Sequence, residues 1–167
     1  MLYEPLLHVV LYQPEIPPNT GNIGRTCVAI GAKLWLVKPL GFQINEKELR
    51  RAGLDYWPFL EWETVENWDE LAQRLASPIA QRRIWLLTKR GEISYTAAEF
   101  QRGDILLFGC ETSGLPEELT TAYSDRTLRI PTRPQVRSLN LSSAAALVMY
   151  EAVRQLGAAE GFQNEEG

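Results

Sequence analysis

Four short runs of apolar residues constrain this chain more than any other feature of its sequence. They occupy residues 7–12 (LHVVLY), 34–37 (LWLV), 83–87 (RIWLL) and 105–108 (ILLF). Runs of this length that are almost wholly apolar are typical of strands buried on both faces of a sheet. Segments with helical character separate them. We therefore predict an α/β fold, a mainly parallel sheet with helices on both faces.

The other elements follow from capping residues, prolines and periodicity. Two further strands are expected, at residues 56–62 and 127–130. Helices are expected at residues 23–30, 46–52, 67–75, 116–123 and 141–156. The chain has 167 residues and no repeat or linker. We predict one domain over residues 1–157, followed by a flexible tail at residues 158–167.

The charge of the chain argues against a protein that coats nucleic acid non-specifically. The formal net charge is −4, whereas such domains are usually basic; a local basic patch remains compatible with this figure. The N-terminus, MLYEPLLHVVLYQPE, lacks the features of a secretory signal. No apolar run approaches the roughly 20 residues of a membrane helix. We therefore predict a cytoplasmic protein with no membrane segment.

Cysteine and histidine are too few for a metal site built from soft ligands. Cys27 and Cys110 are far apart, and His8 is the only histidine, whereas a structural zinc ion takes about four ligands. We predict no bound metal and two free thiols. His8 falls inside an apolar strand and is expected to pack in the core or at its edge.

Four unusual loops follow the ends of predicted strands. Their sequences are PEIPPNTGN, TKRGEIS, GCETSGLP and PTRPQVRSLN. Ligands in parallel α/β sheets bind outside the carboxyl ends of the strands. We therefore expect the four loops to meet at one edge of the sheet and to form the functional site there.

The first loop continues into the segment from Asn19 to Arg25, NTGNIGR. Gly21 and Gly24 permit a close approach of the backbone. A helix that begins at this point would offer free N–H groups to an anion. The alternative is a structural turn and cap, with Arg25 in an ion pair.

The third loop places Glu111 between Gly109 and Gly114, directly after a predicted buried strand. The pattern is not the glycine fingerprint of a dinucleotide site, and it lacks the acidic residue about 20 positions further on. A carboxylate in so tight a loop indicates a functional role. The alternative is helix capping by Thr112 or Ser113, with Glu111 in solvent.

The fourth loop leads directly into a helix with almost no polar face. Ser138 and Asn140 are suited to capping this helix, and AAALVMY then leaves two turns without a polar side. A helix that is apolar all round is buried all round, so we predict a second subunit packed against residues 141–156. Arg133 and Arg137 flank the loop, either as phosphate contacts or as ordinary surface charges.

The three segments NxGNxxR, LFGxExxGLP and IPxxxxxRSLNLSxAAAxxxYEA, in this order, resemble the SPOUT superfamily of RNA methyltransferases. The match is closest to its ribose 2′-O-methyltransferase branch. The stretch RAGLDYW is similar to the small single-domain tRNA enzymes, which methylate the wobble nucleotide 34. The resemblance implies a Rossmann-like sheet with a C-terminal trefoil knot and a homodimer through the C-terminal helix. It also implies S-adenosylmethionine as cofactor and tRNA as substrate.

The resemblance assigns roles to individual residues. The positions that match catalytic residues of the family are Asn19, Arg25, Glu111 and Asn140. Those that would line the cofactor site are Leu87, Gly109, Ile130, Ser138 and Leu139. Substrate contacts are expected at Arg133, Arg137 and Tyr150, the last also near the dimer interface. Arg50 and Arg51 would extend the basic cluster across the dimer.

The sequence therefore predicts methyl transfer from S-adenosylmethionine to a tRNA ribose 2′-hydroxyl, at wobble nucleotide 34. Two alternatives keep the fold: methylation of another tRNA ribose or of ribosomal RNA, and a non-catalytic RNA-binding module. A third is an unrelated nucleotide-binding α/β protein with a phosphate site between Asn19 and Arg25. The combination of Asn19 and Arg25 with Glu111 and Ser138 favours an enzyme over a non-catalytic RNA-binding module. Such a module has no chemical need for all four residues.

Overall fold

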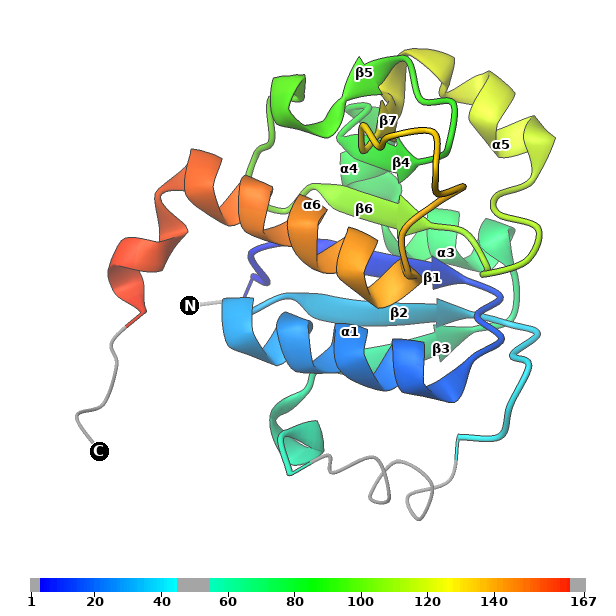
Figure 1. The fold of residues 1–167 in the computed structure, drawn as a ribbon. Helices are drawn as coiled ribbons and strands as arrows, with labels where there is room; N and C mark the ends of the chain where they lie inside the picture. Colours follow the sequence, from blue (N-terminus) through cyan, green and yellow to red (C-terminus); the bar gives the residue numbers. More distant parts are fainter. Residues whose placement is uncertain (1–3, 45–54, 163–167) are drawn as a thin grey trace.

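A seven-stranded sheet in the order β3-β2-β1-β6-β4-β7-β5 forms the centre of the molecule (Figure 1). This computed structural model describes residues 4–44 and 55–162, so the helix predicted at residues 46–52 lies outside the described residues. All neighbouring strands are parallel, which confirms the predicted sheet. The strands are β1 (His8–Tyr12), β2 (Lys33–Val37), β3 (Trp62–Val65), β4 (Ile84–Leu87), β5 (Ile93–Ser94), β6 (Ile105–Phe108) and β7 (Thr127–Arg129).

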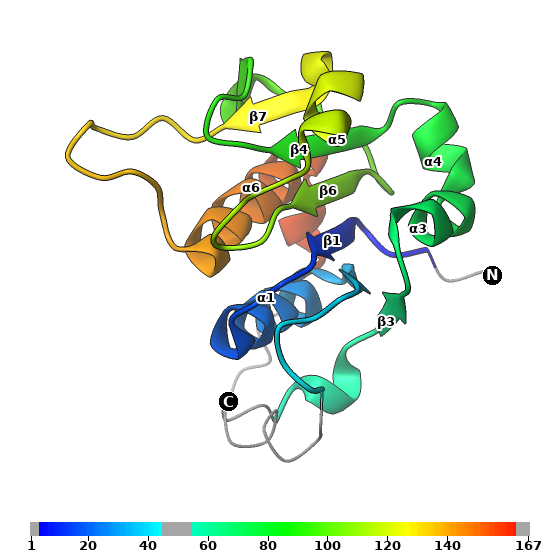
Figure 2. The same cartoon turned by 90° about the vertical axis from the view of Figure 1, so that its right-hand side faces the viewer.

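Helices cover both faces of the sheet, as predicted. In Figure 2, α1 and α6 lie on one face, and α3 and α4 lie on the other. The helices are α1 (Pro17–Ile30), α3 (Trp68–Arg74), α4 (Ala76–Ala80), α5 (Glu117–Ala122) and α6 (Leu141–Leu156). The 3-10 turns are η1 (Trp57–Phe59), η2 (Tyr95–Ala97), η3 (Ser124–Arg126) and η4 (Ala158–Gly161). Within the described ranges, no helix has both the length and the apolar character needed to span a membrane.

Successive residues of the central strands face opposite helical layers. In β1, Val9 and Leu11 belong to the core shared with α1 and α6, whereas Val10 belongs to the core on the other face. All three side chains are completely buried. Because both faces of β1 are covered, neither side of the strand needs polar residues, and the run is apolar apart from His8 at its start.

Helix α1 begins at Pro17, earlier than the predicted start at residue 23. Prolines suit the first turn of a helix because N–H groups at these positions have no acceptor within the helix, so their absence costs nothing. The fixed φ of proline is also already helical. The prediction that the loop extends to residue 22 is wrong. A polar residue such as Asn19 suggested a solvent-exposed loop, but the structure buries Asn19 in the first turn of the helix. The helix ends at Gly31, with φ at 76°, as expected.

The strand predicted at residues 56–62 is wrong. Residues Trp57–Phe59 form the turn η1, and β3 begins only at Trp62. Pro58 fixes its own φ and has no N–H for strand pairing, which favours a turn over a strand. The rings of Trp57 and Trp62 pack with centroids 5.1 Å apart. These aromatic side chains therefore hold the turn against the edge of the sheet.

Strand β7 lies between β4 and β5 although it follows both in the sequence. The connection from β4 to β5 packs tightly against it: a Cβ on Gly91 would lie 2.2 Å from the carbonyl carbon of Leu128. Arg129 donates hydrogen bonds to the carbonyls of Gly91 (3.0 Å) and Glu92 (2.8 Å). Strand β7 is thus held by a loop that precedes it in the sequence, an arrangement that a knotted chain requires. The trefoil knot itself stays a prediction.

His8 lies in β1 at the edge of the core, half-buried, as predicted. Its Nδ1 accepts a hydrogen bond of 3.1 Å from Trp35 Nε1, and this bond requires the unprotonated nitrogen. Burial, followed by the charges of Lys33 and Arg83, lowers the pKa of His8 from 6.5 to about 4. The fold therefore stabilises the neutral ring.

We expect the free energy of unfolding to fall as the pH is lowered from 6.5 to about 4. Across this window the unfolded chain binds a proton at His8 and the folded chain does not, so acid favours unfolding. His8→Gln keeps an acceptor for Trp35 but cannot titrate, and should lose this part of the pH dependence. Urea unfolding at several pH values measures the effect.

The chain has a single histidine, so an NMR titration of its ring protons gives the folded-state pKa directly. A value near 6.5 for the folded protein would contradict the prediction.

Candidate active site

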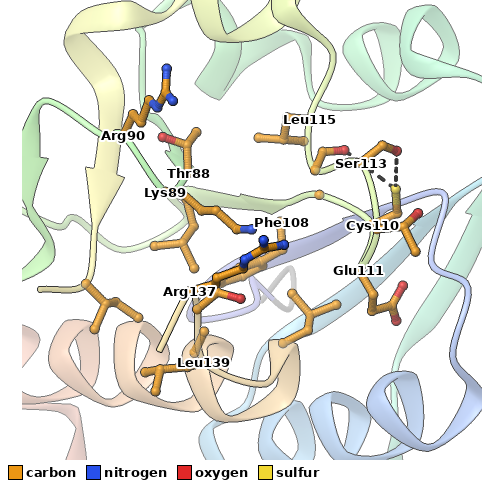
Figure 3. A pocket seen from close by; sticks show the side chains of 18 of the residues that line it. Thr88, Lys89, Arg90, Phe108, Cys110, Glu111, Ser113, Leu115, Arg137 and Leu139 are labelled. Atoms are coloured by element: carbon orange, nitrogen blue, oxygen red, sulfur yellow. Dashed lines mark hydrogen bonds between the residues drawn. The ribbon is translucent and has the colours of Figure 1, made fainter. Parts of the chain in front are cut away.

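A cavity of about 710 Å³ opens at the carboxyl ends of β4, β6 and β7. Leu87 ends β4, Phe108 ends β6 and Ile130 follows β7, and all three line the cavity. The loop between β7 and α6 contributes Arg137 and Leu139 (Figure 3). The cavity thus lies where ligands of parallel α/β sheets bind, and the loops expected to meet at one edge do meet there.

All five positions predicted to hold the cofactor line this cavity. They are Leu87, Gly109, Ile130, Ser138 and Leu139. The three aliphatic side chains and Phe108 provide apolar surface, while Gly109 and Ser138 add polar groups. Pockets of roughly 300–1,000 Å³ with mainly apolar walls and a few polar groups suit drug-sized ligands. The cavity therefore has the size of a small-molecule site and offers both apolar and polar groups to a ligand.

The loop after β6 folds back on itself within a few residues. A Cβ on Gly109 would lie 2.3 Å from the carbonyl carbon of Gly114, and Gly114 has φ at +68°. Cys110 pairs with Gly114 in an isolated β-bridge, and its Sγ lies 2.9 Å from Ser113 Oγ. Only glycine fits at 109 and 114 without moving backbone. The two glycines thus fix the loop that carries Glu111.

A hydrogen-bonded chain joins three of the four residues predicted to be catalytic. Asn140 Nδ2 donates to Asn19 Oδ1 (3.1 Å), and Asn19 Nδ2 donates to Glu111 Oε1 (3.3 Å). Asn140 also caps α6 as predicted, its Oδ1 accepting from the backbone N–H of Ser142 at 2.9 Å. The network therefore connects the start of α1, the loop after β6 and the start of α6.

The start of α1 is not the anion site that the sequence suggested. Its first two helical positions are prolines without N–H groups, and the N–H of Asn19 donates to the Ile16 carbonyl at 3.1 Å. The preceding N–H groups of Glu15 (2.9 Å) and Ile16 (3.2 Å) donate to the Glu111 carboxylate. The protein itself supplies the anion at this helix end.

Arg25 lies further along α1, exposed and outside the lining of the cavity. Its guanidinium carbon is 5.3 Å from the centroid of the Tyr56 ring, and the Tyr56 hydroxyl donates to the Gly21 carbonyl. Burial raises the pKa of Tyr56 to about 12. Gly24 allows the η1 segment to approach, since a Cβ there would be 3.1 Å from Leu60 Cδ2.

The predicted substrate contacts are only partly brought together. Arg137 lines the cavity, whereas Arg133, on the same exposed loop, does not. Tyr150 lies on α6 away from the cavity, with 48% of its surface exposed. Arg50 and Arg51 lie outside the described residues.

The loop after β4 supplies cavity residues to which the sequence assigned no role. They are Thr88, Lys89, Arg90 and Glu92. The signal was present in TKRGEIS, which follows a buried strand and carries two adjacent cations. In the described part of the chain, no three His, Cys, Asp or Glu side chains are grouped to hold a metal. Cys27 and Cys110 are free and buried, which confirms the predicted free thiols.

Two substitutions of Asn140 separate its cap from its link to Asn19. Asn140→Asp keeps the cap acceptor but loses the Nδ2 donor, and should lower the free energy of unfolding by about 1 kcal/mol, one net hydrogen bond. Asn140→Ala loses the cap as well, which costs about 1 kcal/mol more. Urea unfolding of both variants measures the difference. Equal stabilities of Asn140→Asp and the unaltered protein would show that the link to Asn19 contributes nothing.

Comparison with known proteins agrees with this geometry. A tRNA (cytidine(34)-2′-O)-methyltransferase of Methylovorus glucosotrophus is 48% identical over 151 residues, covering 90% of this chain and 96% of the relative. A solved structure concerned with 2-OH methylation of C/U34 on tRNA is 44% identical, with a TM-score of 0.82, covering 92% of this chain and 97% of its own.

The SpoU methyltransferase AviRb of Streptomyces viridochromogenes, solved with AdoMet, is 30% identical with a TM-score of 0.76. The match covers 93% of this chain and 60% of that longer one. The model of the SpoU rRNA Methylase family matches residues 6–150. These findings confirm the resemblance to RNA ribose methyltransferases that the sequence motifs indicated. The chain belongs to the SpoU rRNA methylase family.

Proposed function

We propose that this protein transfers a methyl group from S-adenosylmethionine to the ribose 2′-hydroxyl of tRNA, at nucleotide 34. The observation that carries the proposal is that all five predicted cofactor positions line one and the same cavity. Relatives that cover nearly the whole chain support the substrate, since they are tRNA (cytidine(34)-2′-O)-methyltransferases. The SpoU enzyme solved with AdoMet supports the cofactor.

The cavity fits S-adenosylmethionine in size and in chemistry. Leu87, Ile130 and Leu139 offer apolar surface to an adenine ring, and the tight loop at Gly109 brings backbone polar groups to the same place. When bound, this cofactor supplies a methyl group on a sulfonium, which is transferred by in-line displacement. Positioning of the two reactants then accounts for much of the rate.

The residues of the chain have separate tasks in this reaction. Asn19, Glu111 and Asn140 hold the cavity loops and α1 in one arrangement through their hydrogen bonds. Arg25 would hold the phosphate next to the target ribose and stabilise charge that develops on the 2′-oxygen. It does not act as a base, because a guanidinium stays protonated in proteins.

We also propose a homodimer through α6. Helix α6 buries one side against its own chain but leaves Leu147 and Tyr150 exposed by 42% and 48%. A second copy covering this stripe would remove apolar surface from water. Helix α1 packs beside α6 on the same face of the sheet (Figure 1), and we propose that the second copy extends over α1, where Arg25 is exposed. A dimer can thus bring Arg25 of one chain towards the cavity of the other.

Several further features belong to the same proposal. The domain would span residues 1–157, ending at the left-handed Gly157 that closes α6, with residues 158–167 as a tail. The chain after β7 would form the trefoil knot of the family. An enzyme that acts on tRNA would work in the cytoplasm.

Incubation with labelled S-adenosylmethionine and total tRNA tests the activity. We expect label on the ribose of nucleotide 34, located by nuclease mapping of the purified tRNA. Label on a base, on another tRNA position or only on ribosomal RNA would reject the assignment. Absence of both labelling and cofactor binding would favour the non-catalytic module.

Arg25→Ala should lower the rate of methylation by about a hundredfold or more, the usual effect of losing one oxyanion stabiliser. Cofactor affinity, measured by calorimetry, should stay the same because Arg25 lies outside the cavity. Arg102→Ala is the matched control, since Arg102 is exposed and precedes the opposite, amino end of β6. Full activity of Arg25→Ala would remove Arg25 from the mechanism.

Light scattering at micromolar concentration should report a dimer for the unaltered protein. Leu147→Glu places a charge in the proposed interface and should shift the equilibrium to monomer. Gln81→Glu, at an exposed position before β4, should leave the dimer intact. A stable monomer of the unaltered protein would contradict the proposed interface.

A further inference from the structure

Two cationic side chains, Lys89 and Arg137, face one another across the cavity. Neither is among the predicted cofactor contacts. Lys89 comes from the loop after β4 and Arg137 from the loop after β7. Figure 3 shows both side chains directed into the cavity, with their charged ends towards each other. Arg90 also lines the cavity, but its guanidinium points away from the pair in the same view.

Neither cation is neutralised by the protein in the described residues. No carboxylate there forms an ion pair with Lys89 or Arg137, whereas Lys33, Lys38 and Arg83 are all paired. What distinguishes Lys89 and Arg137 from the other cations without an ion pair is that they converge inside one cavity.

Two carboxylates do line the cavity, and neither compensates for the pair. The carboxylate of Glu111 already accepts hydrogen bonds from the side chain of Asn19 and from the backbone N–H groups of Glu15 and Ile16. Glu92 forms no ion pair with any described cation. Two like charges that converge in a partly enclosed site repel each other, and an anion placed between them removes the repulsion.

We infer that Lys89 and Arg137 form an oxyanion site inside the cavity. The inference rests on the proposed function, which brings two oxyanions to this place: the carboxylate at the amino-acid end of the cofactor and a phosphate of the RNA. An arginine fork and a lysine point charge together suit either group. The reacting sulfonium is itself cationic, so the pair acts on a neighbouring anion and not on the methyl donor.

Lys89 would thus be a positioning residue for the proposed reaction. It would fix the end of the bound molecule that does not react, so that the reacting atoms stay aligned. Its position in the loop held by Arg129 and packed on Leu128 supports this role, because the loop cannot easily move away from the strand.

Binding measurements on Lys89→Met test the inference and identify the anion. S-adenosylhomocysteine carries the carboxylate, and 5′-methylthioadenosine lacks it. If the site holds the carboxylate, Lys89→Met should bind S-adenosylhomocysteine about tenfold more weakly, as expected for one charge-assisted hydrogen bond. Its affinity for 5′-methylthioadenosine should not change. Lys89→Arg should restore most of the lost affinity.

If the site holds an RNA phosphate, both small ligands should bind Lys89→Met normally. The affinity for a tRNA anticodon stem-loop should fall instead, and the slope of log K against log salt should decrease by about 1. Lys38→Met is the matched control, because Lys38 pairs with Glu66 at 2.9 Å and does not line the cavity.

Unchanged affinity of Lys89→Met for S-adenosylhomocysteine and for RNA would overturn the inference. Equal weakening of S-adenosylhomocysteine and 5′-methylthioadenosine would overturn it as well, because that result indicates a general change of the cavity. The unaltered protein is measured alongside. If it binds neither S-adenosylhomocysteine nor tRNA, the proposed function fails first, and that failure is distinguishable from a specific failure at Lys89.

Discussion

The carboxylate of Glu111 accepts hydrogen bonds from the two backbone N–H groups that precede α1 and from the side chain of Asn19. Through Asn19 the same network reaches Asn140, the N-cap of α6. Three segments from distant parts of the sequence are therefore set relative to one another by a few polar contacts. Hydrogen bonds to an ionised acceptor are stronger than neutral ones, and Asn19 is buried. Loss of one member would leave others without partners, so the network acts as a unit.

The parallel sheet explains why these segments meet at all. Parallel strands that run in register bring their carboxyl ends to one edge, and the loops that follow β1, β4, β6 and β7 all lie there. The sheet brings the loops close to each other, and the Glu111 network fixes them. The cavity then forms between the loop after β4, the glycine loop after β6 and the loop before α6.

Local sequence signals predicted much of the fold and part of the site. The four apolar runs became buried strands because both of their faces are covered, a condition that composition alone reveals. Asn140 was recognisable as a cap because capping depends on neighbouring residues only. The start of α1 was missed because the burial of Asn19 depends on Glu111, 92 residues away. The place of β7 between β4 and β5 was equally invisible, since no local pattern encodes the order of strands.

An acidic chain can still bind a polyanion if its carboxylates are already engaged. The net charge is −4, yet Glu63, Glu66, Asp104 and Asp125 each pair with a lysine or arginine of the same chain. Glu151 on α6 likewise pairs with Arg154. These pairs cancel locally, and the field near the cavity is set by the charges that line it, namely Lys89, Arg90 and Arg137 together with Glu92 and Glu111. Substrate attraction depends on this local field and not on the total charge, so the three cations that line one cavity can outweigh a surplus of acid elsewhere.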